Sequence, residues 1–104
     1  LRQIMTKLGE AALFSQAPAI VTGDMNAEPD SREMAVMKEY PGYVDVTAGI
    51  GITYHGYMRT EQPCCIDYIF AKGFVCDSVV KWTDQRDGVF LSDHYPVCAV
   101  LHAE

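Results

Sequence analysis

Three short segments carry residue types that can move protons or bind a cation. They are Gly23-Asp24-Met25-Asn26, Ile66-Asp67-Tyr68-Ile69-Phe70 and Ser92-Asp93-His94-Tyr95-Pro96. Each lies at or next to the end of an apolar run, where a carboxylate or an imidazole is costly to bury without a partner. A carboxylate beside an imidazole fixes the tautomer of the ring and stabilises its protonated form. We therefore predict that the three segments meet in one site, at the carboxyl ends of three strands.

Taken singly, each segment has a simpler interpretation. Gly, Asp and Asn are common turn residues, so Asp24 and Asn26 alone indicate a turn. His94 alone is compatible with a hydrogen-bonded core histidine. Asp67 is harder to explain in this way, because it lies within a predicted strand on the face opposite three large apolar side chains. The order and spacing of the segments together favour a site.

The elements that must position these residues follow from periodicity and turn residues. Apolar residues at helical spacing predict a helix over 1–14, and Asp30 with Glu33 predicts a second, capped helix. Short strands are predicted at 19–21, 43–46 and 52–54, and longer ones at 65–71 and 74–82. A tight turn at Lys72-Gly73 would join the two longer strands into a hairpin. The run at 97–101 has no polar alternation, which predicts a strand covered on both faces.

Composition limits the class of protein. The 104 residues suffice for one small domain or part of one, and a net charge of −6 argues against broad electrostatic binding of nucleic acid. Bound metal ions could still reverse the sign locally at a phosphate site. No apolar stretch approaches the length of a membrane span, and the four cysteines, which lack zinc-site spacing, are expected to be free thiols. Because Leu1 starts within a helical pattern, we expect a piece of a longer protein, whose localisation the sequence does not indicate.

As a set, four motifs resemble the endonuclease/exonuclease/phosphatase superfamily, metal-dependent phosphoesterases similar in fold to pancreatic deoxyribonuclease. The motifs are Val21-Thr22-Gly23-Asp24-Met25-Asn26-Ala27-Glu28-Pro29, Thr53-Tyr54-His55-Gly56, Ile66-Asp67-Tyr68-Ile69-Phe70 and Ser92-Asp93-His94-Tyr95-Pro96-Val97. They occur in the order of the family. The resemblance implies an α/β fold in which residues 1–104 form the C-terminal half of a two-sheet β-sandwich flanked by helices. The N-terminal half, with the Glu that is the principal metal ligand of the family, would be absent.

The resemblance also implies roles for individual residues. Asp24 would orient or deprotonate the attacking water, and Asn26 would hold a phosphate oxygen. His94 would act on the phosphate or its nucleophile, with Asp67 as its orienting partner. Asp93 would be a metal ligand, working with the absent Glu.

The Thr-Tyr-His-Gly motif implies that Thr53 and His55 bind substrate, and a plain loop role for His55 is the equal alternative. The function implied is an Mg²⁺- or Mn²⁺-dependent phosphoester hydrolase, whose substrate could be a small molecule, a lipid or a nucleic acid. The chain alone is expected to be inactive and to self-associate, since half a sandwich exposes an apolar sheet face. The alternative is a non-catalytic, self-associating module that retains only half of the site.

Overall fold

The computed structural model describes residues 1–10 and 16–104, and its first element is helix α1, Arg2–Glu10. Met5 is buried on the inner face of α1, and Leu1 and Leu8 pack beside it. Positions 11–14 of the helix predicted over 1–14 lie outside the described residues. Within the described part of the chain, no helix has the length and apolar character needed to cross a membrane.

A three-stranded antiparallel sheet forms the centre of the fold, in the order β1-β3-β2. Strand β1 is Ala19–Asp24, β3 is Asp67–Lys72 and β2 is Val44–Asp45. The register of β1 and β3 runs from Ala19 opposite Lys72 to Asp24 opposite Asp67. Because the two strands are antiparallel, the carboxyl end of β1 meets the amino end of β3. The prediction that the site lies at the carboxyl ends of three strands is therefore wrong in this detail.

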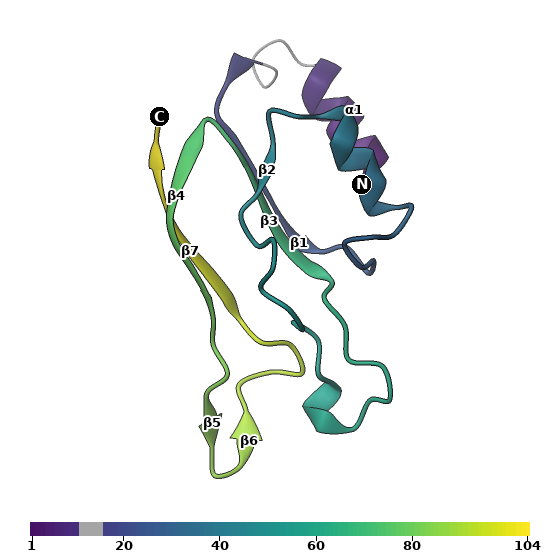
Figure 1. Ribbon diagram of the computed structural model, residues 1–104, viewed down its shortest axis with the longest axis vertical. Helices are drawn as coiled ribbons and strands as arrows, with labels where there is room; N and C mark the ends of the chain where they lie inside the picture. The colour runs from purple at the N-terminus through teal and green to yellow at the C-terminus, as the bar shows by residue number, and fades with distance from the viewer. Residues whose placement is uncertain (11–15) are drawn as a thin grey trace.

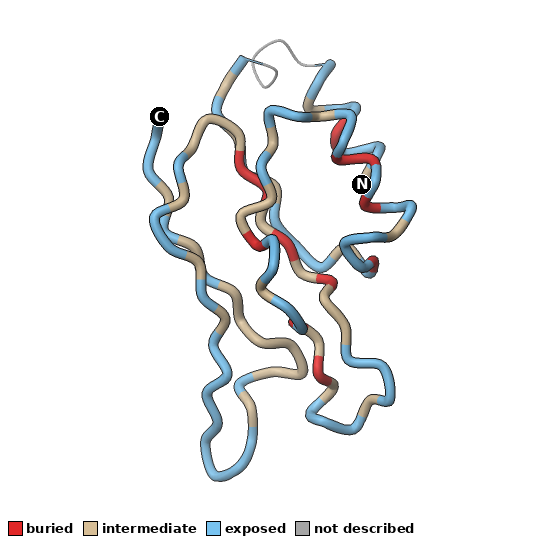
Figure 2. Tube along the Cα trace, in the orientation of Figure 1, coloured by how far each residue is buried: buried red, intermediate tan, exposed pale blue. Residues whose placement is uncertain are grey.

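The hydrophobic core lies between this sheet and two helical segments, α1 and the 3₁₀ helix η1, Met34–Glu39 (Figures 1 and 2). The buried members of the core are Met5, Ala27, Met34, Met37, Tyr68 and Phe70. The rings of Tyr68 and Phe70 stack, with centroids 5.5 Å apart. Alternation along β3 thus sends its two aromatic side chains into the core, as predicted, and leaves Asp67 on the other face.

The cap of the second helix differs from the prediction. Helix η1 begins at Met34, and its N-cap residue, Glu33, makes no side-chain cap hydrogen bond. The backbone N–H of Met34 instead donates to the Ser31 hydroxyl over 3.3 Å. A turn from Glu28 to Ser31 places Ser31, and not Asp30, where it can accept this bond.

Strand β4, Phe74–Lys81, pairs with β7, Val97–Ala103, in a separate two-stranded ribbon (Figure 1). The predicted hairpin with β3 is wrong, because β1 and β2 already occupy both edges of β3. The predicted burial of β7 on both faces is also wrong in this chain, since exposed and half-buried residues alternate along it and Val100 is 53% exposed. Among the described residues, no further layer packs over the exposed face of this ribbon.

Two further connections complete the chain. Strands β5, Gln85–Arg86, and β6, Val89–Phe90, form a hairpin where a charged loop was expected. Its turn residues, Asp87 and Gly88, both have positive φ, which is the geometry that closes a two-residue hairpin. The single-turn 3₁₀ helix η2, Gly56–Met58, follows the segment predicted as a strand at 52–54, where only Tyr54 makes isolated β-bridges.

The chain is more extended than a compact domain of its size. Its radius of gyration is 15.0 Å, against about 13 Å expected for this length. Its accessible surface is 6916 Å², against about 5,800 Å² for a compact monomer of this mass. The excess agrees with the ribbon β4/β7, in which every residue is exposed or half-buried (Figure 2).

Candidate active site

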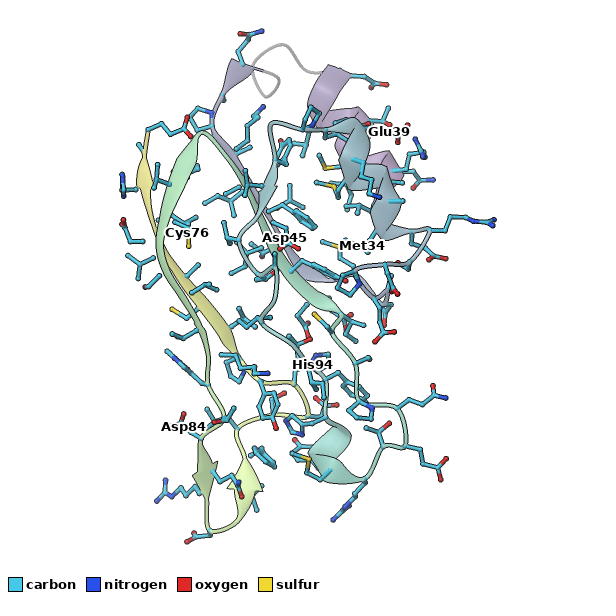
Figure 3. The ribbon with its side chains drawn as sticks, in the orientation of Figure 1. Met34, Glu39, Asp45, Cys76, Asp84 and His94 are labelled. Atoms are coloured by element: carbon cyan, nitrogen blue, oxygen red, sulfur yellow. The ribbon has the colours of Figure 1, made fainter. Side chains whose placement is uncertain are left out.

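The register of β1 and β3 creates a cluster of three side chains at one end of the sheet. Asp24 and Asp67 lie opposite each other in the ladder, and the loop before β7 brings His94 to them. His94 Nδ1 lies 2.7 Å from Asp67 Oδ2, and His94 Nε2 lies 3.8 Å from Asp24 Oδ2. Figure 3 shows His94 below the start of β3, where the sheet ends. The meeting of three segments far apart in the sequence is thus present in the structure.

His94 is held by its own loop and by a tyrosine. The His94 N–H donates to the Ser92 hydroxyl over 3.2 Å, which shapes the turn into β7. The Tyr54 ring lies against the imidazole, with centroids 5.0 Å apart at an angle of 56°. Residue-by-residue reasoning missed Tyr54, although its place inside the Thr-Tyr-His-Gly motif could have pointed to it.

The electrostatics of the cluster favour a protonated His94. Partial burial of the ring opposes the charge, but the hydrogen bond that His94 donates to Asp67 and the charges of Asp67, Asp93 and Asp24 outweigh it, so the pKa of His94 is raised above 6.5. A carboxylate only accepts hydrogen bonds, so Nδ1 carries a proton and donates a hydrogen bond to Asp67. In the neutral ring, the second nitrogen, Nε2, is then the free proton acceptor, and it faces Asp24.

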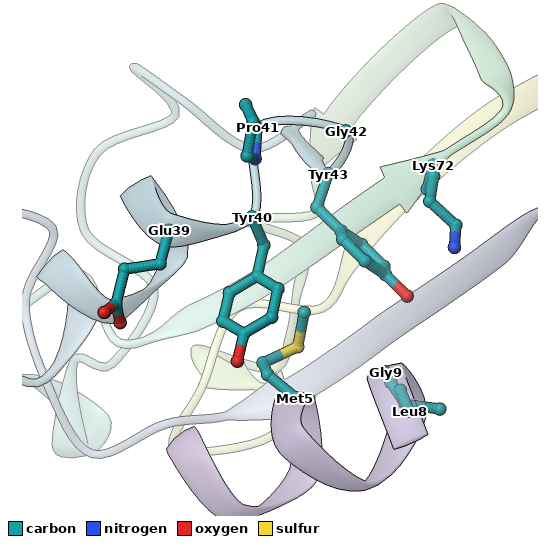
Figure 4. A pocket seen from close by; sticks show the side chains of 9 residues that line it. All are labelled: Met5, Leu8, Gly9, Glu39, Tyr40, Pro41, Gly42, Tyr43 and Lys72. Atoms are coloured by element: carbon teal, nitrogen blue, oxygen red, sulfur yellow. The ribbon is translucent and has the colours of Figure 1, made fainter. Parts of the chain in front are cut away.

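The cluster opens into a groove of about 360 Å³, whose lining includes Asp24, Asp67 and His94. All three side chains are reachable from solvent, with exposed fractions of 38%, 21% and 28%. A second pocket, of about 280 Å³, lies between α1 and residues 40–43 (Figure 4). Lys72, at the far end of β3 from Asp67, lines that second pocket, so it is separate from the cluster.

Two other predicted residues lie beside the cluster in different ways. The N–H of Asn26 donates to Asp24 Oδ1 over 2.8 Å, and Asn26 is exposed with a φ of 51°. This turn fixes the Asp24 carboxylate through the backbone. Asp93 does not join the group of Asp24, Asp67 and His94, whose ligand atoms lie within 4.8 Å of one another, in the described part of the chain. The roles predicted for Asn26 and Asp93 stay predictions.

Thr53 and His55 lie beneath the surface. Thr53 is 0% exposed and His55 is 1% exposed. The Thr53 hydroxyl accepts hydrogen bonds from the N–H groups of Ile66 and Asp67. Neither side chain faces solvent in this structure, and contact with substrate stays a prediction for both.

The donor set of the cluster suits a hard divalent cation. Carboxylate oxygens are preferred ligands of Mg²⁺ and also suit Mn²⁺. Asp24 and Asp67 offer carboxylate oxygens, and Asp67 also accepts the His94 bond. Two carboxylates do not complete six oxygen ligands, so the set fits a cation that keeps water and takes further ligands from substrate or protein.

Several solved structures resemble this chain. An endonuclease/exonuclease/phosphatase from Bacteroides vulgatus is 28% identical with a TM-score of 0.79, over 98% of this chain and 42% of that one. A functionally unknown conserved protein from Enterococcus faecalis V583 is 23% identical with a TM-score of 0.75, over 98% and 42%. A mannosyl-6-phosphatase from Bacteroides thetaiotaomicron VPI-5482 is 22% identical with a TM-score of 0.66, over 97% and 42%. The last two likenesses show the fold alone.

These structures confirm the predicted fold class, and the chain spans less than half of their length. The search of curated proteins found no match. The model of the Endonuclease/Exonuclease/phosphatase family matches residues 1–94. That match covers nearly the whole chain, so the chain belongs to the endonuclease/exonuclease/phosphatase family.

Proposed function

We propose that this chain supplies the Asp-His part of the active site of a metal-dependent phosphoester hydrolase. The observation that carries the proposal is the position of His94, hydrogen-bonded to Asp67 on one side and facing Asp24 on the other. Membership of the family supports phosphoester chemistry in general, and one structural neighbour is a phosphatase. The substrate is a phosphoester, whether a small molecule, a lipid or a nucleic acid.

Each residue has a part that its position supports. Asp24 orients or deprotonates the attacking water, since its carboxylate is open to the groove. Asp67 accepts a hydrogen bond from His94 Nδ1, which orients the ring with Nε2 toward the groove. His94 contacts the phosphate or its nucleophile, and its raised pKa favours a protonated ring that neutralises negative charge. Asn26 holds a phosphate oxygen beside Asp24.

The carboxylates of Asp24 and Asp67 would help hold Mg²⁺ or Mn²⁺, with Asp93 as a further ligand in the complete site. A bound divalent cation neutralises charge on the phosphate oxygens and the leaving oxygen. The two carboxylates also bring a strongly negative local charge to the groove of an acidic chain, which a cation would offset before an anionic phosphoester enters.

A panel of phosphoesters tests the proposal. We expect the full-length protein that carries this chain to hydrolyse at least one member of a panel of bis-p-nitrophenyl phosphate, inositol phosphates, sphingomyelin, short RNA and short DNA with Mg²⁺. Asp24→Asn should abolish that turnover, whereas Asp77→Asn, on the exposed face of β4, should leave it unchanged. Equal turnover in both variants would contradict the proposal.

The 104 residues alone have a second candidate function, that of a non-catalytic, self-associating module. The extended shape and the exposed apolar residues of the ribbon, among them Val75, Val80 and Val100, favour it. Each ribbon strand also has an unpaired edge within the described sheets, where a second copy could add strands. Sedimentation of these residues at micromolar concentration should show a dimer. The same sample should show negligible turnover on the phosphoester panel. A monodisperse monomer, or turnover abolished by Asp24→Asn, would contradict this.

A further inference from the structure

We infer that Thr53 is a positioning residue that sets the geometry of the Asp67–His94 pair. The inference rests on the proposed function and concerns the residue that aligns its catalytic groups. Thr53 lies between the two chain segments that carry Asp67 and His94, and it bonds to both. Because Thr53 is 0% exposed in this structure, we argue this role from its bonds within the fold and not from contact with substrate.

The side chain of Thr53 holds the start of β3. Its Oγ1 accepts from the N–H of Ile66 over 3.0 Å and from the N–H of Asp67 over 3.2 Å. At this end of the sheet, the N–H groups of these two residues thus share one buried oxygen. Without the hydroxyl, one buried donor, the N–H of Ile66, and one part-buried donor, the N–H of Asp67, would lose this acceptor, which costs more than the bonds themselves contribute. The backbone that carries the Asp67 carboxylate would then shift to find other acceptors.

The backbone of the same residue holds the loop that carries His94. The Thr53 carbonyl accepts from the N–H of Tyr95 over 2.6 Å. Two residues on, the N–H groups of His55 and Gly56 donate to the Asp93 carbonyl over 3.0 and 3.1 Å. Residues 53–56 therefore bond to the chain immediately before and immediately after His94.

Aromatic rings pack against this segment. The His55 ring packs on Tyr95 and Phe90, with centroids 4.4 and 4.5 Å apart. Its Nδ1 accepts from the N–H of Tyr57 over 3.0 Å, while Nε2 has no hydrogen-bond partner within residues 1–10 and 16–104. Thr53 thus links this packed segment to the backbone of Asp67 through its hydroxyl, and to Tyr95, next to His94, through its carbonyl.

Three variants test the role. Thr53→Val keeps the shape of the side chain and removes the acceptor, while Thr53→Ser keeps the acceptor and removes a methyl group. Thr47→Val is the matched control, because Thr47 is also a buried threonine and its hydroxyl donates to the carboxylate of Asp45 in β2. The first measurement is the downfield NMR resonance of the His94 Nδ1–H, which reports its bond to Asp67. The second is kcat and KM on the best phosphoester of the panel, using the full-length protein.

We expect Thr53→Val to lose or broaden the His94 resonance and to lower kcat about 10- to 100-fold, with KM nearly unchanged, because displaced groups act mainly on the chemical step. Thr53→Ser should keep the resonance and most of kcat, and Thr47→Val should keep both. If Thr53→Val does not fold, loss of the resonance in folded Thr53→Ser would overturn the inference. Equal losses in Thr53→Val and Thr47→Val, or a rise in KM alone, would also overturn it. The resonance judges the positioning role even if the wild-type protein has no phosphoester turnover, a result that would count only against the proposed function.

Discussion

The Tyr68 hydroxyl connects the two loops that flank the site, and its removal should destabilise the fold. Tyr68 is buried in the core, and its O–H donates to the Ala27 carbonyl over 2.6 Å, with the Cys65 carbonyl 3.3 Å away. Burial, with the negative groups nearby, raises the pKa of Tyr68, so its hydroxyl remains a donor throughout the usual pH range. Ala27 follows the Asp24 turn, and Cys65 precedes β3.

The magnitude follows from these contacts. Tyr68→Phe loses one neutral hydrogen bond, worth about 1 kcal/mol net, and leaves the carbonyl of buried Ala27 without this donor, which costs about 1–3 kcal/mol. We expect the free energy of unfolding to fall by about 2 kcal/mol, since the two terms overlap. In urea, this corresponds to a midpoint lower by about 1 to 2 M for a small domain.

The control for this measurement is Tyr57→Phe. Tyr57 is a half-exposed tyrosine whose hydroxyl has no hydrogen-bond partner among the residues that the structure describes. Its loss should change the free energy of unfolding by less than about 0.5 kcal/mol. If Tyr68→Phe proved as stable as Tyr57→Phe, the hydroxyl would not be holding the two loops together.

Three further predictions concern the cluster. The pKa of His94 is raised in the folded state, so the charged ring stabilises the fold. This contribution is complete below about pH 6.5, the ordinary pKa of histidine, and is lost as the pH rises through the raised pKa. The stability difference between wild type and His94→Gln in urea should therefore shrink with rising pH, and a constant difference would contradict this. Asp67→Asn should lower kcat and move the limb of the pH–rate profile that reports His94 to lower pH, because the carboxylate that favours the charged ring is gone. If this limb did not move, it would not report the titration of His94. Excess chelator should abolish phosphoester turnover, and Mg²⁺ or Mn²⁺ should restore it, whereas full turnover in chelator would exclude the proposed cation.

Much of the site could be predicted because residue type and strand alternation are local properties. Asp67 within an aromatic strand indicated a carboxylate on the face away from the core, and the structure places it there. Its partners Asp24 and His94 lay at the ends of apolar runs that do meet at one end of the sheet. Motifs with these residue types therefore identified the three side chains that the structure brings together.

The remaining features depend on contacts that no local pattern specifies. Strand β4 follows β3 through a glycine turn that is typical of a hairpin, yet β1 and β2 take both edges of β3. The burial of Thr53 could not be predicted, because its motif specifies the residue type and not how deeply the side chain lies in the fold. Asp93 and His94 are neighbours in sequence, and the turn at Ser92 determines which of them joins the cluster.

The central claim is that His94, oriented by Asp67, acts on a phosphoester. The chain offers a close control, because His102 Nδ1 lies 2.9 Å from Asp77 Oδ2 in an exposed pair across β4 and β7. The most direct measurement is the initial rate of hydrolysis of bis-p-nitrophenyl phosphate with Mg²⁺ by the full-length protein and its His94→Gln and His102→Gln variants. We predict a loss of about 100-fold or more for His94→Gln, the usual size of a proton-transfer contribution, and no loss for His102→Gln. Equal rates in the two variants would contradict the account.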